Sequence, residues 1–172
     1  EGKVGTKELD EKVSNVLRLI FRTSMDPHKP FGSLGSPEHG QAGRKIGEEG
    51  VVLLQNNGNV LPIDLNKAKK IAVIGENAIK MMTVGGGSSS LKVKYEISPL
   101  DGLKSRVGSQ AEVVYARGYV GDPTGEYNGV KTGQDLKDNR SEDELLVEAL
   151  QVAKDADYVI FFGGLNKSNH QD

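Results

Sequence analysis

The sequence predicts an α/β domain built around a mostly parallel sheet. Four apolar runs are expected to form strands: VVLLQ (51–55), IAVIG (71–75), AEVVYARG (111–118) and DYVIFFGG (157–164). Helical patterns alternate with these runs, and such alternation is typical of layered α/β folds with parallel strands. The first run is continuously apolar, which is the pattern of a strand buried on both faces.

Each expected helix has an apolar face or a start signal. Residues 8–22 place apolar side chains three and four positions apart, with acids at the start and arginines near the end. Serine followed by proline predicts N-caps for helices over 37–49 and 99–108. Ser141 and Glu144 form a capping-box pattern that opens a fourth helix. Its inward-facing positions are expected to be Leu145, Ala149, Val152 and Ala153.

The segments between these elements are predicted to be turns or irregular chain. Residues 23–37 contain three prolines and should form a linker, and NNGN (56–59) should form a turn. ENAIKMM (76–82) is expected to start a short helix. A flexible glycine loop is expected over 83–90, and the polar segment 119–140 should be largely irregular.

Composition excludes several function classes. The chain has 22 Lys and Arg against 24 Asp and Glu, so no basic excess favours nucleic acid or an anionic membrane. It has no cysteine, which removes disulfides, thiolate metal sites and cysteine nucleophiles. No apolar run approaches the roughly 20 residues that a membrane helix needs, and no signal peptide is visible. Both ends look cut, so we expect the chain to be a fragment of a longer protein.

Sites for a nucleotide or a metal are only weakly indicated. Gly75, Glu76 and Asn77 follow an apolar run, but the second glycine of a dinucleotide-binding turn is missing. GGGSSS (85–90) lacks the lysine of a phosphate-binding loop, and no G-x-S-x-G elbow follows a strand. No histidine pair has metal-ligand spacing; the histidines are His28, His39 and His170. We therefore expect no metal and no cofactor, and the alternative to an enzyme is a noncatalytic α/β binding module for a nucleotide or CoA-like ligand.

Carboxylates gather where the chain is expected to be irregular. Those of the polar segment are Asp122, Glu126, Asp135 and Asp138. They are predicted to lie on a solvated loop, as most charged side chains do. Ligands of open α/β sheets bind at the carboxyl ends of strands. The segment from Gly163 onward, which includes Asp172, is therefore the best location for a functional site.

Several segments together resemble glycoside hydrolase family 3, the β-glucosidase and β-xylosidase family. They are LDEKVSNVLRLIF, EHGQAGRKIGEEGVVLLQNNGNVLPID, KKIAVIGENA, GGGSSSLKVKYEISPLDGL and ADYVIFFGGLN, in this order. The resemblance covers nearly the whole chain. It departs from the family at Gly43, where alanine is usual, and at Gln55, where lysine is usual; Gly47 and Gly50 are also unusual. These changes lower helix propensity without touching the chemistry.

The resemblance implies a fold, a domain organisation and a set of partners. Residues 38–172 are expected to form a three-layer α/β/α sandwich with a mostly parallel sheet, which is incomplete in this chain. Residues 1–37 are expected to be a helix that leaves a barrel domain, followed by a linker. The expected partners are an N-terminal barrel, the rest of the sandwich and a carbohydrate substrate, with no nucleic acid and no membrane span. A homodimer and a periplasmic or secreted location are further expectations.

The resemblance also implies where catalysis occurs. The parent would be a retaining β-glycosidase that acts on terminal β-linked sugars, with its nucleophile, an Asp, on the barrel. The acid/base, a Glu, would lie just beyond Asp172. No catalytic residue is therefore assigned in this chain, which alone is expected to be inactive. The residues expected to bind substrate are Gly86, Ser88, Asn166, His170 and Asp172.

Overall fold

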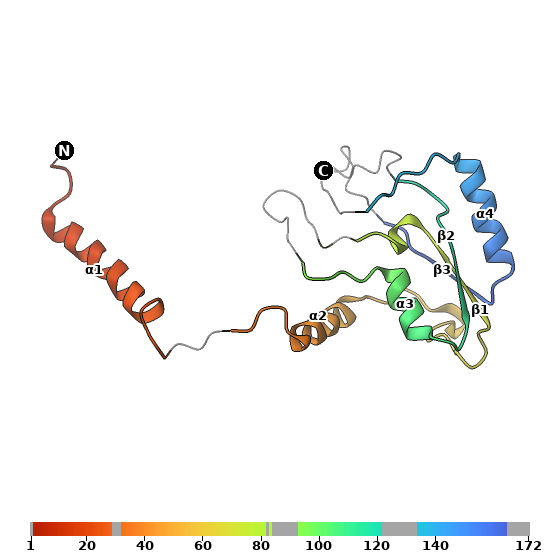
Figure 1. Cartoon of the computed structure of the whole chain (residues 1–172), viewed down its shortest axis with the longest axis horizontal. Helices are drawn as coiled ribbons and strands as arrows, with labels where there is room; N and C mark the ends of the chain where they lie inside the picture. The colour runs from red at the N-terminus through yellow and green to blue at the C-terminus, as the bar shows by residue number, and fades with distance from the viewer. Residues whose placement is uncertain (1, 29–31, 82, 84–92, 122–133, 165–172) are drawn as a thin grey trace. The chain divides into compact units, whose positions relative to one another are not determined.

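A computed structural model describes residues 2–28, 32–81, 83, 93–121 and 134–164. The chain divides into two compact units, 1–52 and 53–172, and each is described by itself (Figure 1). The domain boundary expected near residue 37 stays a prediction. None of the helices in the described ranges combines the length and apolar character needed to cross a membrane.

The first unit contains two helices whose apolar side chains are exposed. Helix α1 spans Thr6–Thr23, and the Glu8 carboxylate accepts a hydrogen bond from the Gly5 backbone N–H at 2.9 Å. Helix α2 spans Pro37–Gly50, where Ser36 accepts from the backbone N–H of His39 as an N-cap. Neither helix buries a residue. Both helices were predicted, and their capping chemistry explains where they start.

The second unit is built on three parallel strands. Strands β1 (Lys70–Ile74), β2 (Glu112–Ala116) and β3 (Tyr158–Phe161) form a sheet in the order β2-β1-β3. Ile71 is in register with Val113 on one side and with Tyr158 on the other. The last three predicted strands and their parallel pairing are thus confirmed (Figure 1).

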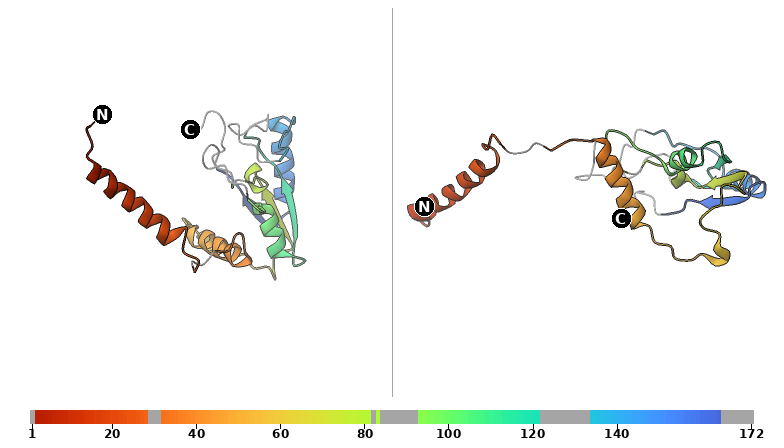
Figure 2. Two further views of the ribbon diagram at one scale, coloured as in Figure 1. Left: turned by 60° about the vertical axis from the view of Figure 1, so that its left-hand side comes forward. Right: turned by 90° about the horizontal axis from the view of Figure 1, so that it is seen from below.

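Helices pack on opposite faces of this sheet. Helix α3 (Pro99–Val107) places Val107 against Ile71, on one face of β1. Helix α4 (Glu142–Lys154) places Ala149 against Ile74, which points to the other face because side chains alternate along a strand. This gives the three layers of an α/β/α sandwich (Figure 2). The predicted capping box is present: the Glu144 carboxylate accepts from the Ser141 backbone N–H at 2.8 Å.

The prediction of a buried strand over 51–55 is wrong. These residues form no strand, and Val51, Val52, Leu53 and Leu54 are between 62% and 92% exposed. A strand needs a ladder partner, and no strand in the described part of the chain pairs with this segment. The short helix expected after β1 is smaller than predicted, because only a 3₁₀ turn, Glu76–Ala78, forms there.

Strand β3 is partly buried on one face and exposed on the other. Tyr158 and Ile160 pack with the α3 side of the core, whereas Val159 and Phe161 are 49% and 62% exposed. A groove of about 380 Å³ runs beside β3 and is lined mainly by apolar side chains, including Val60 and Leu61. Among described residues, the sheet is therefore incomplete at this side, as expected for part of a larger sandwich.

The Asp157 carboxylate fixes the start of β3. It accepts hydrogen bonds from the backbone N–H groups of Lys69 and Lys70 at 2.8 and 2.9 Å, and these bonds hold its pKa below the usual value. We expect Asp157→Ala to accelerate hydrogen exchange of these two amides. Because the folded-state pKa is depressed, the difference from wild type should be present above about pH 4 and shrink below it.

A neighbouring aspartate supplies the control for this prediction. Asp155 lies in the same turn but accepts a hydrogen bond from the Gln151 side chain instead. Asp155→Ala should leave exchange of the Lys69 and Lys70 amides unchanged. Equal exchange in wild type and in Asp157→Ala would show that the carboxylate does not fix the strand.

Candidate functional site

The carboxyl ends of the three strands meet at one edge of the sheet. Gly75 follows β1, Arg117 follows β2 and Phe162 follows β3. In open α/β sheets, side chains and backbone groups at this edge form the ligand site. Charged and polar groups that follow the strands are therefore candidates for a ligand site.

A buried ionic cluster lies at this edge. The Glu76 carboxylate, fully buried, is 3.2 Å from the Lys80 ammonium and 3.0 Å from the Arg117 guanidinium. Arg117 also contacts the Asp138 carboxylate at 3.2 Å, and Asp138 contacts Arg140 at 2.7 Å. Charges alternate along this chain of contacts, which is the arrangement that makes burial of ions tolerable.

The cluster joins segments that are far apart in the sequence. Glu76 also accepts a hydrogen bond from the backbone N–H of Gly121 at 2.9 Å. Gln134 accepts from the Met81 backbone N–H and donates to the Ile79 carbonyl, both at 2.8 Å. The chain leaving β1 is thereby tied to the chain leaving β2 and to the segment that precedes α4.

The Asp138 carboxylate of the cluster is poorly suited to proton transfer. Hydrogen bonds from Arg140 hold the pKa of Asp138 well below its usual range, and Asp138 in turn raises the pKa of Arg140. A general acid needs a raised pKa, which requires the opposite environment. Asp138 is therefore a structural member of the cluster, which ties the chain leaving β2 to the segment before α4.

The backbone leaving β3 passes very close to β1. The N–H of Phe162 donates to the Ile74 carbonyl at 2.7 Å, and its carbonyl accepts from the Tyr119 hydroxyl at 2.8 Å. Gly75 has a φ of +123°, and a Cβ built there would lie 2.2 Å from the Phe162 carbonyl oxygen. Only glycine fits this position.

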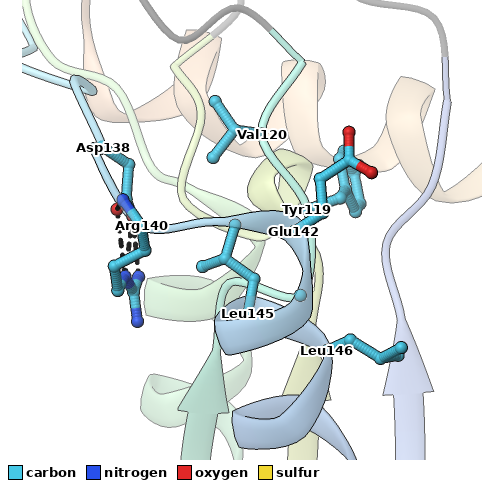
Figure 3. A pocket seen from close by; sticks show the side chains of 8 residues that line it. Tyr119, Val120, Asp138, Arg140, Glu142, Leu145 and Leu146 are labelled. Carbon is cyan, nitrogen blue, oxygen red and sulfur yellow. Dashed lines mark hydrogen bonds and ion pairs between the residues drawn. The ribbon is translucent and has the colours of Figure 1, made fainter.

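A cavity of about 370 Å³ opens beside Tyr119, between the chain leaving β2 and the start of α4 (Figure 3). The Asp138–Arg140 ion pair forms one wall, and Leu145 and Leu146 of α4 line another. An apolar surface with a few charged groups is common in ligand pockets of this size. The cavity borders the same edge of the sheet as the ionic cluster.

The residues predicted from sequence to bind substrate lie outside the described residues. They are Gly86, Ser88, Asn166, His170 and Asp172. The described chain reaches Gly163 and Gly164, at the start of the segment that was expected to hold a functional site. No group of three His, Cys, Asp or Glu side chains in the described ranges could hold a metal ion.

Sequence reasoning misjudged one residue of the cluster and missed several others. Asp138 was expected on a solvated loop, but its side chain is only 11% exposed because it pairs with two arginines. Glu76, Arg117 and Tyr119 were not singled out as members of one site. The signal available was their position at or just after the carboxyl ends of two predicted strands, where charged or polar side chains are brought to the same edge.

The three parallel strands with helices on both faces define the chain as an α/β sandwich domain. Residues 51–172 match the glycosyl hydrolase family 3 C-terminal domain. The chain belongs to this family.

Curated relatives and solved structures agree with this assignment. Beta-glucosidase BoGH3A of Bacteroides ovatus is 43% identical over 178 residues, which covers 100% of this chain and 23% of that protein. Beta-glucosidase B of Emericella nidulans is 35% identical over 122 residues, covering 68% of this chain and 14% of that protein. The crystal structure of a Bifidobacterium adolescentis GH3 beta-glucosidase superposes with a TM-score of 0.71 at 28% identity, covering 100% of this chain and 23% of that one. The chain thus spans less than a quarter of the length of these proteins.

Proposed function

We propose that this chain is part of the sandwich domain of a retaining β-glycosidase that removes terminal β-linked glucose. The observation that carries the proposal is the 43% identity, over the whole chain, to a protein named a beta-glucosidase. The expected partners within the same protein are a barrel domain and the rest of the sandwich. A homodimer is no part of the proposal, because no comparison supports one.

The chemistry requires carboxylates beyond the ones described. A retaining glycosidase uses two carboxyl groups about 5–5.5 Å apart, one as nucleophile and one as acid/base. The buried carboxylates at the sheet edge, Glu76 and Asp138, are each bound to cations. The resemblance to glycoside hydrolase family 3 implies the nucleophile on the barrel and the acid/base in the segment that follows β3, just beyond Asp172, and we adopt both assignments. Sugar contacts are proposed for Gly86, Ser88, Asn166, His170 and Asp172.

The buried Glu76 also argues against the binding-module alternative. In a dinucleotide site, the turn after the first strand must receive phosphate charge. Here that turn holds the fully buried Glu76 carboxylate. This carboxylate accepts a hydrogen bond from the Gly121 backbone N–H, a group that could otherwise bind an anion. The backbone N–H and the two cations that could receive a phosphate here, those of Gly121, Lys80 and Arg117, are already bound to Glu76, and this disfavours a nucleotide.

The proposal is tested with the whole protein and aryl glycosides. We expect hydrolysis of an aryl β-glucoside at a rate well above that of the matching α-glucoside. Proton NMR during the first turnovers should show β-glucose as the first product, before mutarotation. Each of the two steps of a retaining glycosidase inverts the anomeric carbon, so the product keeps the β-configuration of the substrate. Failure of the folded protein to hydrolyse any aryl β-glycoside, or the α-anomer as first product, would contradict the proposal.

A further inference from the structure

One side chain that follows β2 contacts the chain where it leaves β3. Tyr119 stands three residues after the end of β2, and its hydroxyl donates to the Phe162 carbonyl oxygen at 2.8 Å. Its ring also contacts the ring of Phe161, with centroids 5.9 Å apart. Tyr119 thus bridges the ends of two strands that are not neighbours in the sheet, because β1 lies between them.

The glycine before Tyr119 makes this crossing feasible. Gly118 has a φ of +72°, and a Cβ there would lie 2.7 Å from a methyl carbon of Ile74. The chain leaving β2 can therefore pass close over the end of β1 only without a side chain at this position. The tyrosine that follows is placed within reach of the Phe162 carbonyl.

Within the described residues, few side-chain contacts fix the backbone of 162–164. The next residues, Gly163 and Gly164, have no side chains, and Gly164 has a φ of +145° that glycine adopts easily. Among described residues, Tyr119 makes the only side-chain hydrogen bond to the segment 162–164. Phe162 is also held by its backbone bond to Ile74 and by packing of its side chain against the core cluster that contains Val73.

The Tyr119 hydroxyl stays protonated and can donate its hydrogen bond. Burial raises the pKa of Tyr119 above its ordinary value, an effect opposed in part by the backbone N–H of Asn77. The hydroxyl therefore keeps its proton at neutral and mildly alkaline pH, and the bond to Phe162 persists over the range in which enzymes are assayed.

We propose that Tyr119 is a positioning residue for proton donation to the leaving group. The inference rests on the proposed function, in which the acid/base belongs to the segment after β3. Tyr119 does not touch the reacting atoms; its hydroxyl fixes the Phe162 carbonyl and hence the point and direction from which that segment starts. A general acid displaced by about 1 Å loses much of its effect, because proton transfer needs hydrogen-bond distance.

The test is Tyr119→Phe in the whole protein, which removes one oxygen atom and retains the ring contact. Kinetics are measured on two aryl β-glucosides, one with a good leaving group, such as 2,4-dinitrophenol, and one with a poor leaving group. We expect kcat/KM to fall roughly tenfold, about 1.4 kcal/mol, for the poor leaving group only. The good leaving group departs without protonation and should react at nearly the wild-type rate.

Tyr115→Phe is the matched control. Tyr115 lies on β2, and its hydroxyl donates to the Gly75 carbonyl at 3.3 Å rather than to β3. Burial raises the pKa of Tyr115 to about 12, so it too is a protonated donor that loses one oxygen in the variant. A general loosening of the sheet edge would affect both variants alike, whereas the positioning role predicts a leaving-group dependence in Tyr119→Phe alone.

Each result decides the inference. Equal effects on both substrates, no effect on either, or the same pattern in Tyr115→Phe would overturn it while leaving the proposed function intact. If the wild-type protein hydrolyses no β-glucoside, the proposed function fails and the inference fails with it. Faster hydrogen exchange at Gly163 and Gly164 in Tyr119→Phe than in Tyr115→Phe is expected, and equal exchange would also overturn the positioning role.

Discussion

Replacing Glu76 by alanine is expected to destabilise the carboxyl edge of the sheet by about 3–5 kcal/mol, the usual effect of removing one member of a buried ion pair. The carboxylate lies between the Lys80 ammonium and the Arg117 guanidinium, and both side chains are less than 10% exposed. Without the carboxylate, the two cations repel each other in a region with little water. The Gly121 backbone N–H also loses its acceptor. Hydrogen exchange of β1 and β2 amides in the whole protein measures the loss.

Two further variants serve as controls. One tests whether the effect comes from the charge of Glu76 or from its volume, and the other tests whether it depends on burial of the ion pair. Glu76→Gln keeps the shape but removes the charge, so it should recover only part of the loss. Glu48→Ala removes a carboxylate from the exposed pair with Arg44, where both side chains are at least 60% exposed, and should change little. A small effect of Glu76→Ala, comparable with that of Glu48→Ala, would mean that the buried cluster does not hold the edge together.

Replacing Gly75 by alanine is expected to cost about 2–6 kcal/mol of local stability, since a left-handed backbone at a non-glycine residue and a steric clash each cost roughly 1–3 kcal/mol. The added Cβ would lie 2.2 Å from the Phe162 carbonyl oxygen, which belongs to the backbone and cannot rotate away. Relief requires β1 and the end of β3 to separate, which breaks the bond from Phe162 to Ile74. Hydrogen exchange at Phe162 should therefore accelerate strongly.

Gly102→Ala controls for the loss of a glycine as such. Gly102 lies within α3, and a Cβ there meets only a methyl group of Ile97 at 3.7 Å, an ordinary contact. Alanine is favoured over glycine in a helix by about 1 kcal/mol, so this variant should be neutral or more stable. If Gly75→Ala were tolerated as well as Gly102→Ala, the backbone at Phe162 would not lie close enough to Gly75 to exclude a side chain.

Local chemistry explains which parts of the fold could be predicted from sequence. Helix starts at Ser36, Ser98 and Ser141 depend on a cap within three residues, so the signal lies within one turn of chain. The strands at 70–74 and 158–161 were predicted because apolar runs of that length, flanked by glycine, favour buried strands. The run at 51–55 has the same composition but forms no strand, because strand formation also needs a partner that composition does not reveal.

The candidate site was less predictable because its contacts join distant residues. Glu76 and Arg117 are 41 positions apart, and Tyr119 and Phe162 are 43 positions apart. Strand order decides these contacts: both β2 and β3 pair with β1, which brings their ends to the same edge. Sequence reasoning placed the functional region at the carboxyl ends of strands, and it could not specify which side chains would meet there.

We expect the carboxyl edge of this sheet to form part of a β-glucosidase active site. A crystal structure of the whole protein with a glucose-derived inhibitor tests it most directly. We expect the sugar to lie at the edge formed by the ends of β1, β2 and β3. A carboxyl group from the segment after Gly164 should lie within about 3 Å of the position of the glycosidic oxygen, the distance that proton transfer requires. A sugar bound away from this edge, with its acid supplied by another part of the protein, would contradict the account.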